Sequence, residues 1–178
     1  MRYQDFPASY PLNVRASTMV LRTIRAAVTE DAEAVEAIRL RLTRPDIGES
    51  LLLVTSVAMC AVAVQQLTDE RGVLDLDAVL AAVGGNCSDN NDGPMSRTRA
   101  AVFAATLGGV GYPELLEPML LDPAGWSSTW PAIVEAITSL LWLQANGRGE
   151  PAVVAYQLLV KQMMALPGHA RQTARASR

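Results

Sequence analysis

The chain of 178 residues has very little histidine, lysine or aromatic side chain. Its single histidine is His169, so a Ser-His or Cys-His nucleophile system has only one candidate base. Aromatic residues make up 5% of the chain, and the sequence has few runs in which apolar and polar residues alternate. Lysine occurs once, at Lys161, so 14 of the 15 basic residues are arginine. These shortages disfavour a β-sheet fold and a nucleophilic enzyme.

Cysteine and long apolar runs are also scarce. The two cysteines, Cys60 and Cys87, form neither a disulfide framework nor the Cys/His spacing of a zinc site. The longest apolar run, residues 51–64, has 14 residues, short of the roughly 20 that cross a bilayer. The N-terminal stretch lacks the apolar region of a signal peptide. We therefore expect a cytoplasmic protein with no metal, cofactor or membrane partner, and a buried central helix at residues 51–64.

The residues that are present favour helices. Hydrophobic residues make up 50% of the chain and charged residues 19%, which is typical of a globular protein, and the length suits one domain. Apolar residues recur at helical spacing. We predict an all-α, single-domain bundle of about seven or eight helices over residues 14–167. An extended arm with aromatic and proline residues should precede it at residues 1–13, and a disordered, basic tail should follow at residues 168–178.

Capping and helix-breaking residues predict several helix ends. Residues 17–43 form either one helix or two, with Thr29 as the expected N-cap of the second. Asp75 is expected to cap a short helix over residues 76–83, which Gly84 and Gly85 terminate. The last helical pair, residues 140–167, has the layout of a tetratricopeptide unit, but no 34-residue repeat runs through the chain. This pair is therefore predicted to be an antiparallel helical hairpin.

The most polar interval is VGGNCSDNNDGPMSR, residues 83–97. Its spacing of Asn, Asp and Gly suggests a calcium loop, which requires a bidentate Glu at its twelfth position. With Gly93 at the sixth position of such a loop, the twelfth is Arg99, and a cation there opposes calcium binding. The interval is predicted to be a mobile connector between two helices, because Asn and Asp tolerate turn conformations.

Residues 75–111 resemble the second and third helices of a helix-turn-helix or winged-helix DNA-binding domain. The resemblance implies that Arg97, Thr98 and Arg99 begin a recognition helix and contact nucleic acid. The intervening turn of about ten residues is longer than the three or four of the motif. The preceding helix would also bring acidic side chains, including Asp75, toward the phosphates. A DNA-binding transcriptional regulator with a degenerate helix-turn-helix is therefore an alternative.

Three of the nine aromatic residues, Tyr3, Phe6 and Tyr10, lie in the N-terminal arm. Pro7 and Pro11 keep such a segment extended, and we expect its aromatic side chains to bind a partner. The favoured interpretation is a non-catalytic cytoplasmic helical protein with an interaction or regulatory role, binding a protein partner or self-associating as a homo-oligomer. The alternatives are the DNA-binding regulator and an enzyme whose site is assembled only in the fold.

Trp130 and Trp142 lie near the two ends of one predicted helix. Large aromatic side chains dominate cores and interfaces, so this helix is expected to be central to packing or to a subunit interface. The methionines could line an adaptable groove, but such residues more often fill a core.

Overall fold

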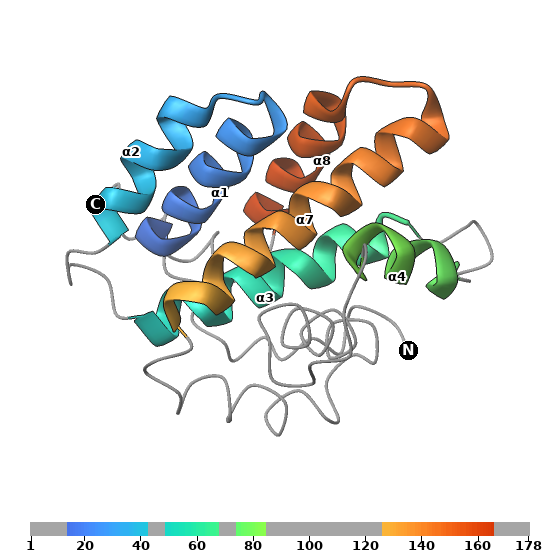
Figure 1. The fold of residues 1–178 in the computed structure, drawn as a ribbon. Helices are drawn as coiled ribbons and strands as arrows, with labels where there is room; N and C mark the ends of the chain where they lie inside the picture. The colour runs from blue at the N-terminus through green and yellow to red at the C-terminus, as the bar shows by residue number, and fades with distance from the viewer. Residues whose placement is uncertain (1–13, 43–48, 68–73, 85–125, 166–178) are drawn as a thin grey trace.

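Figure 1 shows the protein as a computed structural model that describes residues 14–42, 49–67, 74–84 and 126–165. This part of the chain is helical and contains no β-strand, which confirms the all-α prediction for it. The expected N-terminal arm, most of the predicted connector at residues 83–97 and the C-terminal tail lie outside it. The described helices are α1 (Val14–Val28), α2 (Ala32–Leu42), α3 (Glu49–Gln65), α4 (Leu76–Gly84), α7 (Trp126–Arg148) and α8 (Ala152–Ala165).

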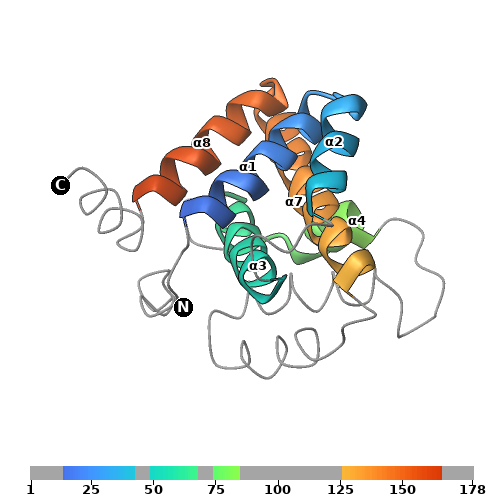
Figure 2. The ribbon, with the colours of Figure 1, turned by 90° about the vertical axis from the view of Figure 1, so that its left-hand side faces the viewer.

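Helix α7 is the centre of the packing. It contacts α1, α3, α4 and α8, which agrees with the prediction drawn from its two tryptophans. In both ribbon views α2, α1 and α8 lie side by side, with α3 below them (Figures 1 and 2). Helices α1, α3 and α7 run in the same general direction, and α2 and α8 run back against them (Figure 1).

Helix α3 is buried on every side along residues 55–64, none of which is more than 2% exposed. The buried hydroxyl of Ser56 on this helix makes two hydrogen bonds. Ser56 Oγ donates to Leu52 O at 2.8 Å and accepts from Trp130 Nε1 at 3.0 Å. The predicted buried helix is therefore confirmed. Among the described helices, none combines the length and hydropathy of a membrane span.

Residues 14–42 form two helices joined by a tight turn. The N–H of Asp31 donates to Ala26 O at 2.9 Å, and the N–H of Glu30 donates to Ala27 O at 3.1 Å. These two bonds are the pattern of a Schellman C-cap, whose residue after the helix is left-handed. That residue is Glu30, with φ of 56°. The turn reverses the chain, so α2 packs back on α1.

The N-cap of α2 is Asp31, whose Oδ1 accepts from the N–H of Ala34 at 3.0 Å. The prediction that Thr29 caps this helix is wrong, because the Thr29 hydroxyl donates back to Arg25 O at 2.9 Å. The predicted cap of α4 is confirmed, since Asp75 Oδ1 accepts from the N–H of Ala78, the third residue of that helix, at 3.0 Å.

A second Schellman turn joins α7 to α8. The N–H of Glu150 donates to Ala145 O at 3.0 Å, and the N–H of Gly149 donates to Asn146 O at 3.3 Å. Gly149 has φ of 65°, which glycine adopts without steric cost. Helix α7 thus continues to Arg148, and the predicted helical hairpin is present.

Candidate functional site

The residues predicted to bind partners lie outside the described part of the chain. The residues predicted to bind a protein partner are Tyr3, Phe6 and Tyr10, and those predicted to contact nucleic acid are Arg97, Thr98 and Arg99. The polar interval from residue 85 onward, which includes Cys87, lies outside the described part too, and so does His169.

The described residues include a partly apolar outer surface on α8. One side of this helix is buried against α1, α3 and α7, through Ala152, Ala155, Leu159 and Met163. The opposite side carries four exposed residues at helical spacing, and we call them the outer stripe. The outer stripe consists of Val154, Gln157, Lys161 and Met164.

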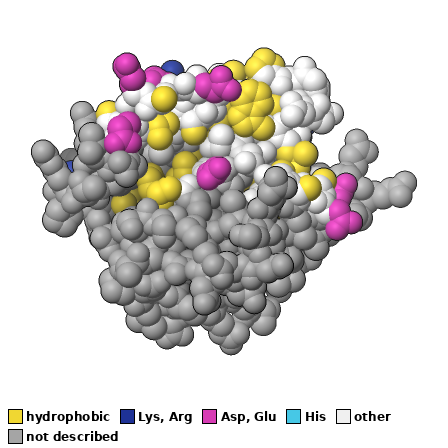
Figure 3. Space-filling view, viewed as in Figure 1, with side chains coloured by type: hydrophobic (Ala, Val, Ile, Leu, Met, Phe, Trp, Pro, Cys, Tyr) yellow, Lys and Arg dark blue, Asp and Glu magenta, His cyan; other side chains and the backbone are white. Residues whose placement is uncertain are grey.

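The apolar members of the outer stripe are well exposed, at 38% for Val154 and 44% for Met164. Nearby in sequence, Val153 is 37% exposed, and Trp142 on α7 is 39% exposed. Figure 3 shows hydrophobic side chains at the surface in the region of α7 and α8. Lys161 is the only charged residue in α8. The outer surface of this helix therefore has little of the charge that usually covers a solvent-facing helix.

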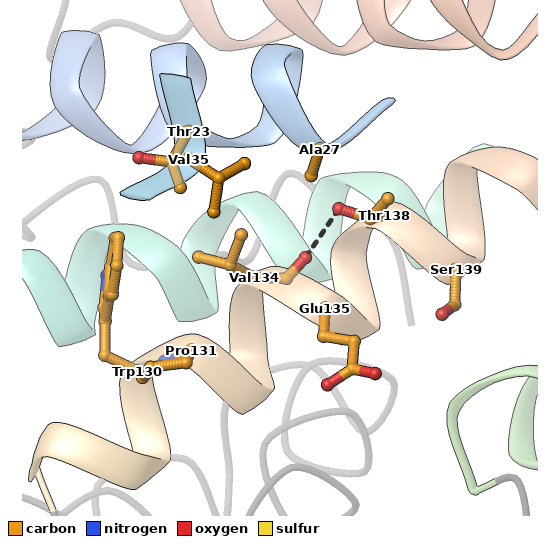
Figure 4. A pocket seen from close by; sticks show the side chains of 9 residues that line it. All are labelled: Thr23, Ala27, Val35, Trp130, Pro131, Val134, Glu135, Thr138 and Ser139. Atoms are coloured by element: carbon orange, nitrogen blue, oxygen red, sulfur yellow. Dashed lines mark hydrogen bonds between the residues drawn. The ribbon is translucent and has the colours of Figure 1, made fainter. Parts of the chain in front are cut away.

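A groove of about 220 Å³ is lined by residues of α1, α2 and α7 (Figure 4). Val35 of α2 and Val134 of α7 point toward one another across it. This volume exceeds the roughly 150 Å³ of an apolar cavity that holds a benzene ring. The lining residues are Thr23, Ala27, Val35, Trp130, Pro131, Val134, Glu135, Thr138 and Ser139.

The groove offers few polar groups to a ligand. The Thr138 hydroxyl donates to Val134 O at 2.9 Å, so its proton is already used within α7. Glu135 is exposed and is the one charged residue among those that line the groove. Acidic side chains are visible beside the hydrophobic ones in this region (Figure 3). The groove can hold an apolar side chain, but it lacks a base and an acid placed together for catalysis.

Two glutamines place polar atoms in the core. Gln144 of α7 is 3% exposed, and neither its Nε2 nor its Oε1 has a hydrogen-bond partner. Gln66, just after α3, donates from Nε2 to Gln162 Oε1 at 2.8 Å, while its own Oε1 is unpaired. Unpaired buried polar atoms cost stability and are rare in folded proteins.

The titratable groups of the core are not activated for catalysis. Burial raises the pKa of the Cys60 thiol to about 12, so it stays protonated at neutral pH and is a poor nucleophile. Burial also raises the pKa of Tyr156 on α8, and the positive charge of Arg25 on α1 opposes that rise. In the described ranges, no three His, Cys, Asp or Glu side chains are grouped as metal ligands.

A scan against known protein families found no matching family. Searches of curated proteins and of solved structures found no significant match either. A function must therefore be argued from the surfaces described above.

Sequence reasoning identified the residues of these surfaces as apolar but did not locate the surfaces. Trp130 was expected on a helix central to packing or to an interface, and the groove beside it exists because α2 packs on α1 while leaving a space beside α7. The outer stripe has only a partial signal in the sequence, namely the polar residues Gln157 and Lys161 at helical spacing. Which side remains uncovered depends on where the other helices pack.

Proposed function

We propose that the protein is a non-catalytic helical interaction protein that self-associates through the outer surface of α8. The observation that carries this proposal is the exposure of Val154 and Met164 on a helix with a single charge, Lys161. Exposed apolar surface on a folded protein commonly marks an interaction site.

The test compares the solution mass of the unmodified chain with that of a Val154→Lys variant. A lysine at this position would have to lose its water on association, so we expect the variant to shift toward the 19.1 kDa monomer. The matched control is Ala37→Lys, which adds the same charge at an exposed position on α2. Light scattering at equal concentration measures all three. An unchanged mass for Val154→Lys beside an oligomeric unmodified chain would place the contact elsewhere.

The groove between α2 and α7 favours a second candidate function, the binding of an apolar side chain from a partner protein. Its apolar lining and its room for an aromatic ring support this candidate. The negative charge of Glu135 favours a partner segment in which an Arg or Lys lies next to the apolar side chain that enters the groove.

A neutral solvatochromic dye tests whether the groove takes an apolar ligand. We expect its fluorescence to rise with the unmodified chain and with Val154→Lys, and to lose that rise with Thr138→Trp, which fills the groove. Ala37→Trp adds the same ring at an exposed position on α2 and is the control. Equal dye binding by all four proteins would show that the groove is not the site.

A further inference from the structure

The groove lined by α1, α2 and α7 can accept hydrogen bonds but has few protons to donate. Thr23 and Thr138 each donate their hydroxyl proton to the carbonyl oxygen four residues earlier in their own helix, at 3.0 Å and 2.9 Å. The indole N–H of Trp130 is used as well, because it donates to Ser56 Oγ at 3.0 Å. Both threonine oxygens keep lone pairs that can accept. The groove therefore suits a ligand that donates hydrogen bonds.

The charge at the groove is negative. Glu135 is exposed at its rim and is the one charged residue among the described residues that line it. A carboxylate accepts hydrogen bonds and donates none. Among the lining side chains, Ser139 alone keeps a hydroxyl proton for a ligand. An anionic ligand would meet the Glu135 carboxylate with a single side-chain donor beside it, so carboxylic acids fit this groove poorly.

The apolar part of the lining matches the size of one ring. Val35 and Val134 point toward one another across the groove, and Trp130 and Pro131 lie beside them (Figure 4). The volume of about 220 Å³ lies between the roughly 150 Å³ that holds benzene and the roughly 300 Å³ at which pockets for drug-sized ligands begin. Val134 and Glu135 are consecutive in α7, so a short linker can join a ring in the groove to a charge at the carboxylate.

We propose that the groove binds a small arylalkylammonium compound, with its ring between Val35 and Val134 and its ammonium group at Glu135. A primary ammonium has three donors and no acceptor, which complements the acceptors of the groove. Its hydrogen bonds to a carboxylate are charge-assisted and stronger than neutral ones. A peptide would also bring backbone carbonyl groups to a rim that offers few donors, so a free small molecule is the better occupant.

Three ligands of the same shape test the chemistry of the site. Phenethylammonium, phenethyl alcohol and hydrocinnamate are titrated separately at low salt, and ligand-detected NMR measures each dissociation constant. We expect phenethylammonium to bind about three- to tenfold more tightly than the alcohol and hydrocinnamate to bind most weakly. Added salt should reduce the preference for the ammonium. If the alcohol or hydrocinnamate binds as tightly as the ammonium, the proposal is overturned.

A charge-removing variant tests the place of the ammonium group. Glu135→Gln keeps the shape of an exposed side chain, so we expect it to bind the alcohol as before and to lose the preference for the ammonium. The matched control is Glu33→Gln, which removes the same charge from the side of α2 away from Val35 and should keep the preference. Equal losses in the two variants, or no loss in Glu135→Gln, would overturn the assignment of Glu135.

A fourth ligand separates this inference from the binding of a partner side chain in the same groove. A peptide blocked at both ends, in which phenylalanine precedes lysine, carries the ring and the ammonium group on a backbone. We expect it to bind more weakly than phenethylammonium. Tighter binding of the peptide would overturn the inference and assign the groove to a protein partner. Failure of all four ligands would remove the groove as a site and leave self-association through α8 standing.

Discussion

Gln144 is the buried side chain whose surroundings suit it least. Its amide is unpaired at both polar atoms, although the residue lies on the core side of α7. Methionine has a similar shape without the amide, so Gln144→Met should raise the free energy of unfolding by about 1–3 kcal/mol. Denaturant titration measures the change.

The control for this prediction is Gln157→Met, which makes the same change at an exposed position and should alter stability by less than about 0.5 kcal/mol. A loss of stability in Gln144→Met would show that the amide has a bound partner, such as an ordered water molecule.

Cys60 gives the folded protein a defined response to high pH. Its pKa is about 12 in the folded chain and 9.0 in the unfolded chain. The folded state therefore keeps the proton that the unfolded state releases, and stability falls as pH rises above 9. Between neutral pH and pH 10 this single group should cost about 1.4 kcal/mol.

The measurement for Cys60 is the slope of unfolding free energy against pH, compared with that of Cys60→Ala. The variant loses core packing at every pH, but its slope between pH 8 and pH 10 should be shallower by the contribution of the thiol. Identical slopes would mean that the thiol ionises alike in both states.

At the scale of elements, the turn between α1 and α2 has one strained position. Glu30 has a left-handed backbone conformation, with φ of 56°. For a residue with a Cβ atom, this conformation is unfavourable by roughly 1–2 kcal/mol. Glycine adopts it freely. Glu30→Gly should therefore raise the midpoint of thermal unfolding. We expect the free energy of unfolding to rise by about 1 kcal/mol, because the relief of strain exceeds the entropic cost of a more flexible unfolded chain.

The control for the turn is Glu33→Gly, which places glycine inside α2 and should lower stability by about 1 kcal/mol. Differential scanning calorimetry of both variants checks the prediction. Destabilisation by both substitutions would show that the Glu30 side chain stabilises the turn more than its backbone strains it.

The N-cap of a helix was predictable from the sequence where only one nearby residue could cap that helix. Asp75 was expected to begin α4, and its carboxylate does accept the capping bond. The cap near Thr29 was predicted wrongly, because Asp31, two residues later, also carries a side chain that can cap a helix. The Schellman turn, with Glu30 at its left-handed position, settles the choice for Asp31.

The burial of α3 was also predictable, since an uncharged run of that length has no face suited to water. The outer stripe and the groove were not. Both arise from relative helix positions: α8 presents one apolar side to α1, α3 and α7 and leaves the other uncovered, and α2 stands away from α7 at Val35. Helical periodicity gives the faces of a helix but not its neighbours.

At the scale of the whole molecule, α7 holds the described helices together and the exposed apolar surface lies on its hairpin partner, α8. The buried thiol and the apolar groove supply no catalytic group, while the outer stripe and the groove both suit binding. We therefore propose that the chain is a packed helical scaffold whose exposed surfaces meet other proteins, and first of all a second copy of itself.

The solution mass of the unmodified chain, followed by light scattering from low to high protein concentration, tests this account most directly. The account predicts a mass that rises from 19.1 kDa toward twice that value and then stays constant, because a contact between the same surface of two copies closes on itself. A mass that remains at that of the monomer across the whole range would contradict self-association through α8.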